Sequence, residues 1–524
     1  MKVISESQSY RLRIIALMIM VIAIPLSNYL MSVSQFLLAG IWLIDGDFKA
    51  KYQRLKSNPV FWVLISLFLI HLPGLIHTSA FKYASQDLRV KLPLIILPIL
   101  LGSYEPVKLK DIRKLFVIYV YALVVGSLYG FYRYFYVDWD DIRLIINFIS
   151  HVRFSLNLVF GIVISIYLFN TSSQVIVRKI HWIVLIAWFA FFLFVLESVT
   201  GLFLLFFILW VFAFYRAIVA KKSVHKLILW IVILLIPVSI FTIVSGYMRS
   251  YFSLPDLNPS ALPLKTANGN NYSHTWDTTT VENGHILTLF VCEKELKKAW
   301  EKRSRLNYDG ADQIKQPLKK TLLRYLNSKG LTKDSAGVMS LTDHEIKAVE
   351  QGFANVIYCN KFSVKSRLYK VFFEYSCYKH TGQSRGYSVI QRIVLWKAAL
   401  NVIGQNFLFG VGTGDVPDKF EQELKNMKSD LQDTSLRAHN QYLSIFIALG
   451  IFGFMWFMFV MIYPPFKLGL FKNWIFVSFF IIIMCSMLTE DTLETEAGVV
   501  FVAFFLSFFY FTARKLMEWE PEKR

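Results

Sequence analysis

Three residues with reactive or polar side chains stand directly before a long apolar segment, in RAHNQYLSIFIALGIFGF (437–454). His439 is a candidate general base, because a neutral imidazole accepts the proton of a hydroxyl group near pH 7. Asn440 can orient the imidazole ring or a ligand, and Arg437 supplies a fixed positive charge. A histidine here could also merely anchor the end of a membrane helix, but its two polar neighbours favour a role in chemistry.

Two further arginines lie next to apolar segments. Arg153 begins one such segment in HVRFSLNLVFGI, and Arg392 lies in SVIQRIVLWKAAL, whose apolar spacing is that of an amphipathic helix on a bilayer surface. Guanidinium groups suit a diphosphate, since they donate bidentate hydrogen bonds and never lose their proton. Either side chain could instead extend to the lipid headgroups. For Arg153 we favour an anionic partner, and for Arg392 both interpretations stay open.

The turn FLFGVGTGDVPDKF (407–420) combines three glycines with Asp415. It can be interpreted as a phosphate-binding loop. A tight turn that returns the chain to the membrane surface is the simpler interpretation, so Asp415 is a secondary candidate.

The composition indicates an all-α polytopic membrane protein. Of 524 residues, 55% are hydrophobic and only 18% are charged, against about 25% charged in ordinary soluble domains. The net charge of +20 fits the lysines and arginines that collect in cytoplasmic loops, and no nucleic-acid motif accompanies it. Phosphate-loop, dinucleotide, HExxH and GxSxG motifs are missing from the sequence, and the four cysteines lack metal-ligand spacing. We therefore expect no metal, no cofactor and no nucleic-acid partner.

About twelve apolar segments match the roughly 30 Å of bilayer hydrocarbon, and they divide the chain into three regions. Residues 1–246 hold about nine spans, residues 247–440 form a large, mainly helical loop domain with an amphipathic helix near 388–404, and residues 441–524 hold about three spans. The segments are 13–27, 32–45, 59–77, 92–103, 115–136, 151–169, 181–196, 200–219, 227–246, 441–463, 473–488 and 497–513.

Basic residues predict the orientation. Seven basic clusters fall on one side if every span crosses, so both termini are expected in the cytoplasm. DWDD (138–141) and TEDTLETE (489–496) then lie outside, together with the loop domain. Lys82, Arg89 and Lys91 do not fit this pattern. The orientation gathers Arg153 and His439 at the outer face, together with the acidic residues Glu197, Glu490, Asp491 and Glu494.

The same residues resemble a known family, the O-antigen ligase and O-antigen polymerase superfamily of bacterial envelope glycosyltransferases. The resemblance rests on Arg153 in HVRFSL, RIVLWKAALNVIGQNFLFGVGTGD (392–415), AHNQYLSIFIALGIFGF (438–454) and TEDTLETEAGVVF (489–501). Residues 281–356 resemble the external domain of ligase-like members from Bacteroidetes.

The resemblance implies a GT-C-like fold in the bacterial inner membrane, with a periplasmic loop domain and a periplasmic active face. The donor would be a glycan on undecaprenyl pyrophosphate, and the acceptor a sugar hydroxyl, typically on lipid A-core. By position, His439 would activate the acceptor hydroxyl, and Arg153 and Arg392 would bind the donor diphosphate. Transfer would invert the anomeric centre and need no metal.

One departure and several alternatives stay open. Many relatives carry a Ser-Arg pair where this chain reads LESVTGLF (196–203), so one phosphate contact is either absent here or comes from elsewhere, for example from Arg437 or Arg324. Asn440, Asp415, Glu490 and Glu494 are secondary candidates. A polymerase and a transferase acting on protein serine or threonine are close variants. A lipid-linked oligosaccharide transporter is the alternative of another class, disfavoured because the charges gather at one face without an internal repeat. A channel or scaffold lacks any filter or repeat pattern.

Overall fold

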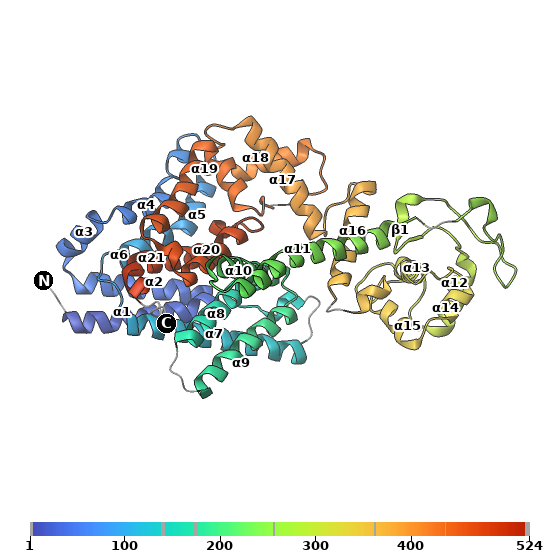
Figure 1. Ribbon diagram of the computed structural model, residues 1–524. Helices are drawn as coiled ribbons and strands as arrows, with labels where there is room; N and C mark the ends of the chain where they lie inside the picture. The colour runs from blue at the N-terminus through green and yellow to red at the C-terminus, as the bar shows by residue number, and fades with distance from the viewer. Residues whose placement is uncertain are drawn as a thin grey trace. The chain divides into compact units, whose positions relative to one another are not determined.

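The computed structural model describes residues 4–137, 142–171, 176–254, 257–360, 363–434 and 436–518 (Figure 1). The acidic segment 138–141, which the charge pattern places outside, is not among them. The chain forms two compact units: the first runs to Phe212 and resumes at Arg392, and the second covers Ala213–Gln391. The unit boundaries fall within α10 (Val199–Val219) and α17 (Ser388–Gln405).

The other helices of the first unit lie on both sides of the second unit in sequence. They are α1 (Glu6–Leu26), α2 (Asn28–Asp45), α3 (Phe48–Lys56), α4 (Pro59–Leu69), α5 (Phe81–Lys91), α6 (Pro93–Gly102), α7 (Leu109–Tyr136), α8 (His151–Thr171), α9 (Ile176–Val195), α18 (Val416–Asn426), α19 (Gln441–Lys467), α20 (Trp474–Ser486) and α21 (Glu496–Glu518). Short 3₁₀ turns join them at η1 (Pro73–Leu75), η2 (Ile142–Ile145), η6 (Leu470–Lys472) and η7 (Thr492–Glu494).

By length and composition, seven helices in the described part of the chain could cross a membrane: α1, α7, α8, α10, α19 and α21, and α11 (Ser223–Phe252) of the second unit. The number rises to eight if α2 and α3, which are bent by 115° at their break, count as one span. Shorter apolar helices cover Pro59–Leu75, Lys179–Val195 and Trp474–Ser486. The predicted apolar segments lie largely in helices, which confirms a mostly helical protein with several helices able to cross a membrane, whereas twelve crossings stay a prediction.

The core of the first unit is built on α8 and α21, of whose apolar windows 83% is buried. α8 packs on α20 and α9, and α21 packs on α6. Phe160 of α8 meets Phe479 of α20 and Phe505 of α21 with ring centroids 5.5 and 5.0 Å apart. Because aromatic rings of this kind interlock tightly, the ends of these three helices are held in a fixed arrangement.

α19 is broken at Gly450, where the glycine loop 407–414 inserts. Gly450 has φ 64° and ψ −166°, a conformation that side-chain-bearing residues rarely adopt. The carbonyls that the break releases accept hydrogen bonds from the loop: Ile447 from the Val411 N–H at 2.8 Å and Ala448 from the Gly412 N–H at 3.0 Å. The break therefore leaves these backbone groups satisfied, as a low-dielectric environment requires.

The second unit contains α11, α12 (Glu293–Arg303), α13 (Leu318–Ser328), α14 (Ser335–Met339), α15 (Asp343–Glu350) and α16 (Val364–Thr381). It also has 3₁₀ turns η3 (Pro259–Ala261), η4 (Thr278–Thr280) and η5 (Val356–Cys359) and one hairpin of β1 (Val281–Glu282) and β2 (His285–Ile286). The hairpin pairs Val281 with Ile286 and turns at Asn283 and Gly284, both with positive φ, as a two-residue hairpin turn demands.

Two helix ends of this unit follow local sequence rules. Thr342 caps α15, and the reciprocal hydrogen bonds with Glu345 complete a capping box. Gly330, with φ 69°, stands just past the end of α13, where glycine commonly ends a helix. A separate apolar core forms around the fully buried Trp300, Tyr325 and Leu326, so this unit has its own hydrophobic interior.

Candidate active site

The loop 489–494 (TEDTLE), which joins α20 to α21, contacts every basic side chain that the sequence singled out in the first unit. Arg392 contacts Thr489 and Glu490, Arg153 contacts Thr492, and Arg437 contacts Glu494. His439 contacts Asp491 of the same loop. Residues from three distant parts of the chain thus converge on six consecutive residues.

His439 combines an unusual backbone conformation with an accessible side chain. It adopts a left-handed backbone conformation with φ 47°, which is uncommon for residues other than glycine and concentrates at functional sites. Its backbone N–H donates to Asp491 Oδ2 at 2.9 Å, and its ring Nδ1 lies 3.9 Å from the same oxygen. The His439 side chain is 37% exposed whereas that of Asp491 is 7% exposed. The imidazole is therefore accessible and is backed by a buried carboxylate.

The charge pattern places Asp491 at the outer face, but Asp491 was not among the candidate site residues predicted from the sequence. Its Oδ1 accepts hydrogen bonds from the Asn440 N–H at 3.1 Å and from Ser444 Oγ at 2.8 Å. Burial raises the pKa of Asp491, Glu494 raises it further, and Ser444 and His439 act in the opposite direction. The acidic cluster was visible in the sequence, but nothing there showed which of its carboxylates meets His439.

Asn440 begins α19. Its side-chain oxygen accepts hydrogen bonds from the N–H groups of Tyr442 and Leu443 at 3.0 and 3.2 Å. This is an N-cap, which satisfies the otherwise open amides of the first helical turn. The cap fixes the direction of α19 directly after His439, so Asn440 acts on His439 through the backbone.

Arg153 and Arg392 reach the loop from α8 and α17. Arg153 is 7% exposed and its Nη1 donates to Thr492 Oγ1 at 3.1 Å. Arg392 donates from Nε to the Thr489 carbonyl at 3.3 Å and from Nη2 to Glu490 Oε1 at 3.2 Å. Both guanidinium groups are thus oriented by neighbouring residues of one loop, and Arg392 keeps a half-exposed head.

Arg437 and Glu494 form the other end of the site. Arg437 donates to the Glu494 carbonyl at 3.0 Å and to the Tyr83 hydroxyl at 3.1 Å. The Glu494 carboxylate accepts from Lys91 Nζ at 2.9 Å, and Lys91 also binds Asp87 at 2.5 Å. Burial would raise the pKa of Glu494, but the ammonium of Lys91 and the guanidinium of Arg437 hold it below its ordinary value.

Lys91 and Asp87 were also missed as site residues. Lys91 did not fit the charge pattern, and the structure supplies the reason: it is 1% exposed and paired with two carboxylates, so it is not a loop charge that orients the chain. The spacing of Asp87 and Lys91, four residues apart on α5, was visible in the sequence. The partner Glu494, about 400 positions away, was not.

The remaining candidates lie elsewhere. Arg324 belongs to the second unit, where it donates to both carboxylate oxygens of Glu282 at 2.9 Å and stacks on Phe373. Asp415 accepts hydrogen bonds from the N–H groups of Ser79 and Ala80, and therefore fixes the start of α5.

The glycine loop next to Asp415 behaves as a tight turn. The five amides of residues 410–414 donate to acceptors of the protein itself, namely Asn406 O, Ile447 O, Ala448 O, Gly74 O and Thr78 Oγ1. Since these amides are already used, the turn interpretation is the better of the two. Among the described residues, no group of three or more His, Cys, Asp or Glu side chains is placed to hold a metal ion.

Comparison with known proteins finds one family in the part of the chain that holds several of these residues. A family model described as O-antigen ligase matches residues 340–458, a range that includes Arg392, Arg437 and His439. No curated protein matches the chain. The matched range also covers the glycine loop and the break in α19. The resemblance found in the sequence is therefore confirmed for this part of the chain: residues 340–458 match the O-antigen ligase family model.

Proposed function

We propose that this protein transfers a glycan from undecaprenyl pyrophosphate to a sugar hydroxyl, typically on lipid A-core, at the periplasmic face of the bacterial inner membrane. Its partners are the lipid-linked donor, the glycan acceptor and the surrounding lipids. The convergence of His439, Arg153 and Arg392 on the loop 489–494 is the observation that carries this proposal.

The residues divide the reaction between them. His439 takes the proton of the acceptor hydroxyl as its oxygen bonds to the anomeric carbon, and the bond from that carbon to the diphosphate oxygen breaks. The diphosphate leaves with the electron pair, and Arg153 and Arg392 stabilise its charge. Direct attack inverts the anomeric configuration.

Asp491 supports the base. A carboxylate beside the ring stabilises the imidazolium that forms when His439 takes the proton, because opposite charges attract strongly away from water. The 3.9 Å between Nδ1 and Oδ2 is longer than a hydrogen bond and short enough for this interaction. Arg437 remains the candidate for a third diphosphate contact.

The decisive experiment uses purified protein, a lipid-linked glycan donor and an acceptor glycolipid. His439→Ala should lower the transfer rate by about 10²-fold to 10⁴-fold, as expected for loss of a general base. The thermal unfolding temperature of the variant should stay near that of wild type. The matched control is His225→Ala, an exposed histidine of α11, which should transfer normally. Transfer by His439→Ala at the wild-type rate would contradict the assignment.

Lipopolysaccharide ladders then separate the two activities of the superfamily. A ligase predicts that cells without the gene lose all long-chain species and accumulate lipid-linked polymer. Persistence of core carrying a single repeat would instead identify a polymerase.

A further inference from the structure

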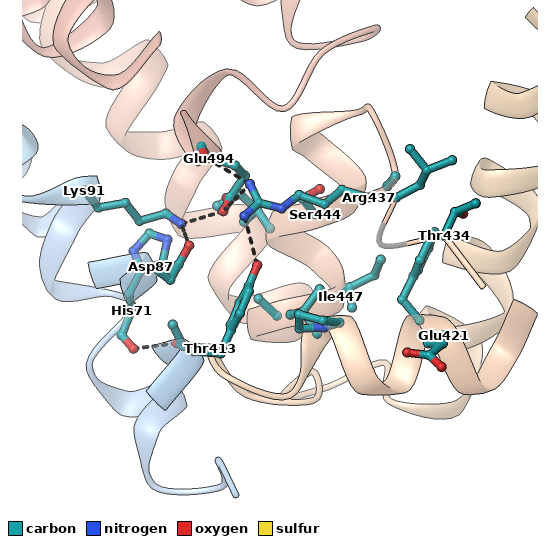
Figure 2. A pocket seen from close by; sticks show the side chains of 18 residues that line it. His71, Asp87, Lys91, Thr413, Glu421, Thr434, Arg437, Ser444, Ile447 and Glu494 are labelled. Carbon is teal, nitrogen blue, oxygen red and sulfur yellow. Dashed lines mark hydrogen bonds and ion pairs between the residues drawn. The ribbon is translucent and has the colours of Figure 1, made fainter. Parts of the chain in front are cut away.

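A cavity of about 330 Å³ adjoins the candidate active site within the first unit (Figure 2). One end is polar and is lined by His71, Asp87, Lys91 and Glu494, while Phe420 and Ile447 line the apolar wall. Its volume lies at the lower end of the roughly 300–1,000 Å³ typical of small-molecule sites. A cavity with an apolar wall and a few convergent polar groups is the usual form of such a site.

The polar end is buried and already neutralised. Figure 2 shows Lys91 directed toward Asp87 and Glu494, at 2.5 and 2.9 Å. Arg437 lines the same cavity and is held by Glu494 and Tyr83. Two cations thus face two carboxyl groups, of which Glu494 is ionised and Asp87, whose pKa is raised to about 7, is ionised above that pH. An anionic ligand would have to compete with the carboxylates for these cations, whereas a neutral polyhydroxyl ligand can donate to the carboxylates and accept from Lys91.

His71 contributes a buried ring nitrogen to the polar end of the cavity. The residue is 2% exposed, it lines the cavity, and its Nδ1 has no hydrogen-bond partner among the described residues. An unpaired buried nitrogen is costly unless something binds it. A ligand hydroxyl in the cavity would satisfy it.

Ser444 connects the cavity to the general base. It lines the cavity, and its Oγ donates to Asp491 Oδ1 at 2.8 Å. The second oxygen of Asp491 accepts from the His439 N–H. Asp491 therefore links Ser444, which lines the cavity, to His439, the proposed general base.

We propose that this cavity binds the terminal ring of the acceptor glycan, and that it selects a neutral pyranose over an acidic one. The hydroxyls of the sugar ring bind His71, Asp87 and Lys91, and the apolar face of the ring packs on Phe420. The inference rests on the proposed function, because it names the acceptor class of the same site, but it is tested by binding alone.

The test is saturation-transfer NMR on the full chain in a detergent without a sugar headgroup. The probes are neutral methyl pyranosides (gluco, galacto, manno and the two N-acetylhexosamines) and, as the matched acidic probe, methyl glucuronide. Wild-type protein should transfer saturation to at least one neutral probe and much less to the glucuronide. Failure of every neutral probe, or equal transfer to the glucuronide, would overturn the proposal.

Two variants locate the binding. His71→Phe removes the unpaired nitrogen at similar size, and Leu436→Trp fills the cavity from a half-buried wall position. Each should weaken binding of the neutral probe by about tenfold or more. Leu400→Trp, at an exposed position of α17, is the control and should bind normally. If both cavity variants bind as wild type does, the ring lies elsewhere and the proposal is wrong.

His439→Ala separates this proposal from the proposed function. It should bind the neutral probe as wild type does, since His439 does not line the cavity. Wild-type transfer by His439→Ala together with intact probe binding would contradict the catalytic assignment alone. If His439→Ala loses transfer while His71→Phe and Leu436→Trp bind the neutral probe as wild type does, only the cavity proposal is contradicted.

Discussion

At the scale of single residues, Asp491 holds His439 in a backbone conformation that few residues adopt. One carboxylate accepts the N–H groups of His439 and Asn440 and the hydroxyl of Ser444. Its burial favours the neutral form, and its partners favour the charged form. A carboxylate placed in this way both orients the base and stabilises its protonated state.

Asp491→Asn tests this role. The variant keeps the size of the side chain but removes the charge, so kcat should fall by about 10²-fold or more with little change in the KM for the donor. Ser444→Ala is the milder control, since it leaves the carboxylate and the His439 contact in place, and its kcat should fall by less than about tenfold. Steady-state transfer kinetics measure kcat and KM for both variants. An unchanged kcat in Asp491→Asn would contradict the role of Asp491 in supporting His439.

Arginine differs from lysine at the same positions because its planar head donates in parallel pairs. Arg153→Lys and Arg392→Lys keep the charge and lose this geometry. Each should lower kcat/KM for the lipid-linked donor by about tenfold or more, with a rise in the apparent donor requirement. Arg514→Lys, whose side chain is 92% exposed, is the control, and a donor titration is the measurement. A donor requirement equal to that of the control would show that the two guanidinium groups do not contact the diphosphate.

At the scale of elements, the break in α19 matters more than its apolar length. The loop 407–414 donates to the carbonyls that the break releases, and Ile451 N–H donates to the Phe407 carbonyl at 2.8 Å. The first half of α19, which follows His439, is thereby joined to the loop that leads into α18. The connection places α18 and α19 beside the same cavity, which Phe420 of α18 and Ile447 of α19 line.

Gly450→Ala tests the break. An added Cβ would stand 2.2 Å from the Leu408 carbonyl oxygen, and the positive φ alone costs about 1–2 kcal/mol. Thermal unfolding in detergent should therefore shift to lower temperature by several degrees. Gly404→Ala, at a helical position of α17 with open space around the new Cβ, is the control and should be neutral or slightly stabilising. Equal stability of the two variants would mean that the break can relax.

At the scale of the whole molecule, the buried charges tie α5 to the loop 489–494. Burial and the neighbouring Glu494 raise the pKa of Asp87 to about 7. In the unfolded chain the same group titrates near 3.8. Between these values the folded protein holds a proton that the unfolded chain has released, so this contribution to stability is full below about pH 4 and is lost as the pH rises toward about 7.

Asp87→Asn should remove this contribution. The wild-type unfolding temperature should fall between about pH 5.5 and pH 7.5, and the fall should be smaller in Asp87→Asn. Asp418→Asn, an exposed aspartate of α18, is the control and should keep the wild-type slope. Thermal unfolding over this pH range is the measurement. Identical slopes in wild type and Asp87→Asn would show that Asp87 does not titrate there.

The sequence by itself indicated a mostly helical membrane protein with a mainly helical loop domain, and it singled out Arg153, Arg392 and His439 as candidates. These follow from local rules: apolar length, 3.6-residue periodicity, caps such as Thr342, and side-chain chemistry. Arg392 and His439 also fall inside the range that matches the O-antigen ligase family model.

Only the tertiary structure decided which groups meet. Asp491 is the partner of His439, and Lys91 is a buried cation between Asp87 and Glu494. The glycine loop donates hydrogen bonds to the carbonyls at the break in α19. No local rule predicts such contacts, because they join segments tens to hundreds of residues apart and depend on how helices pack. Asn440 is the instructive case: its type predicts a polar contact, and only the fold shows that its amide oxygen caps a helix.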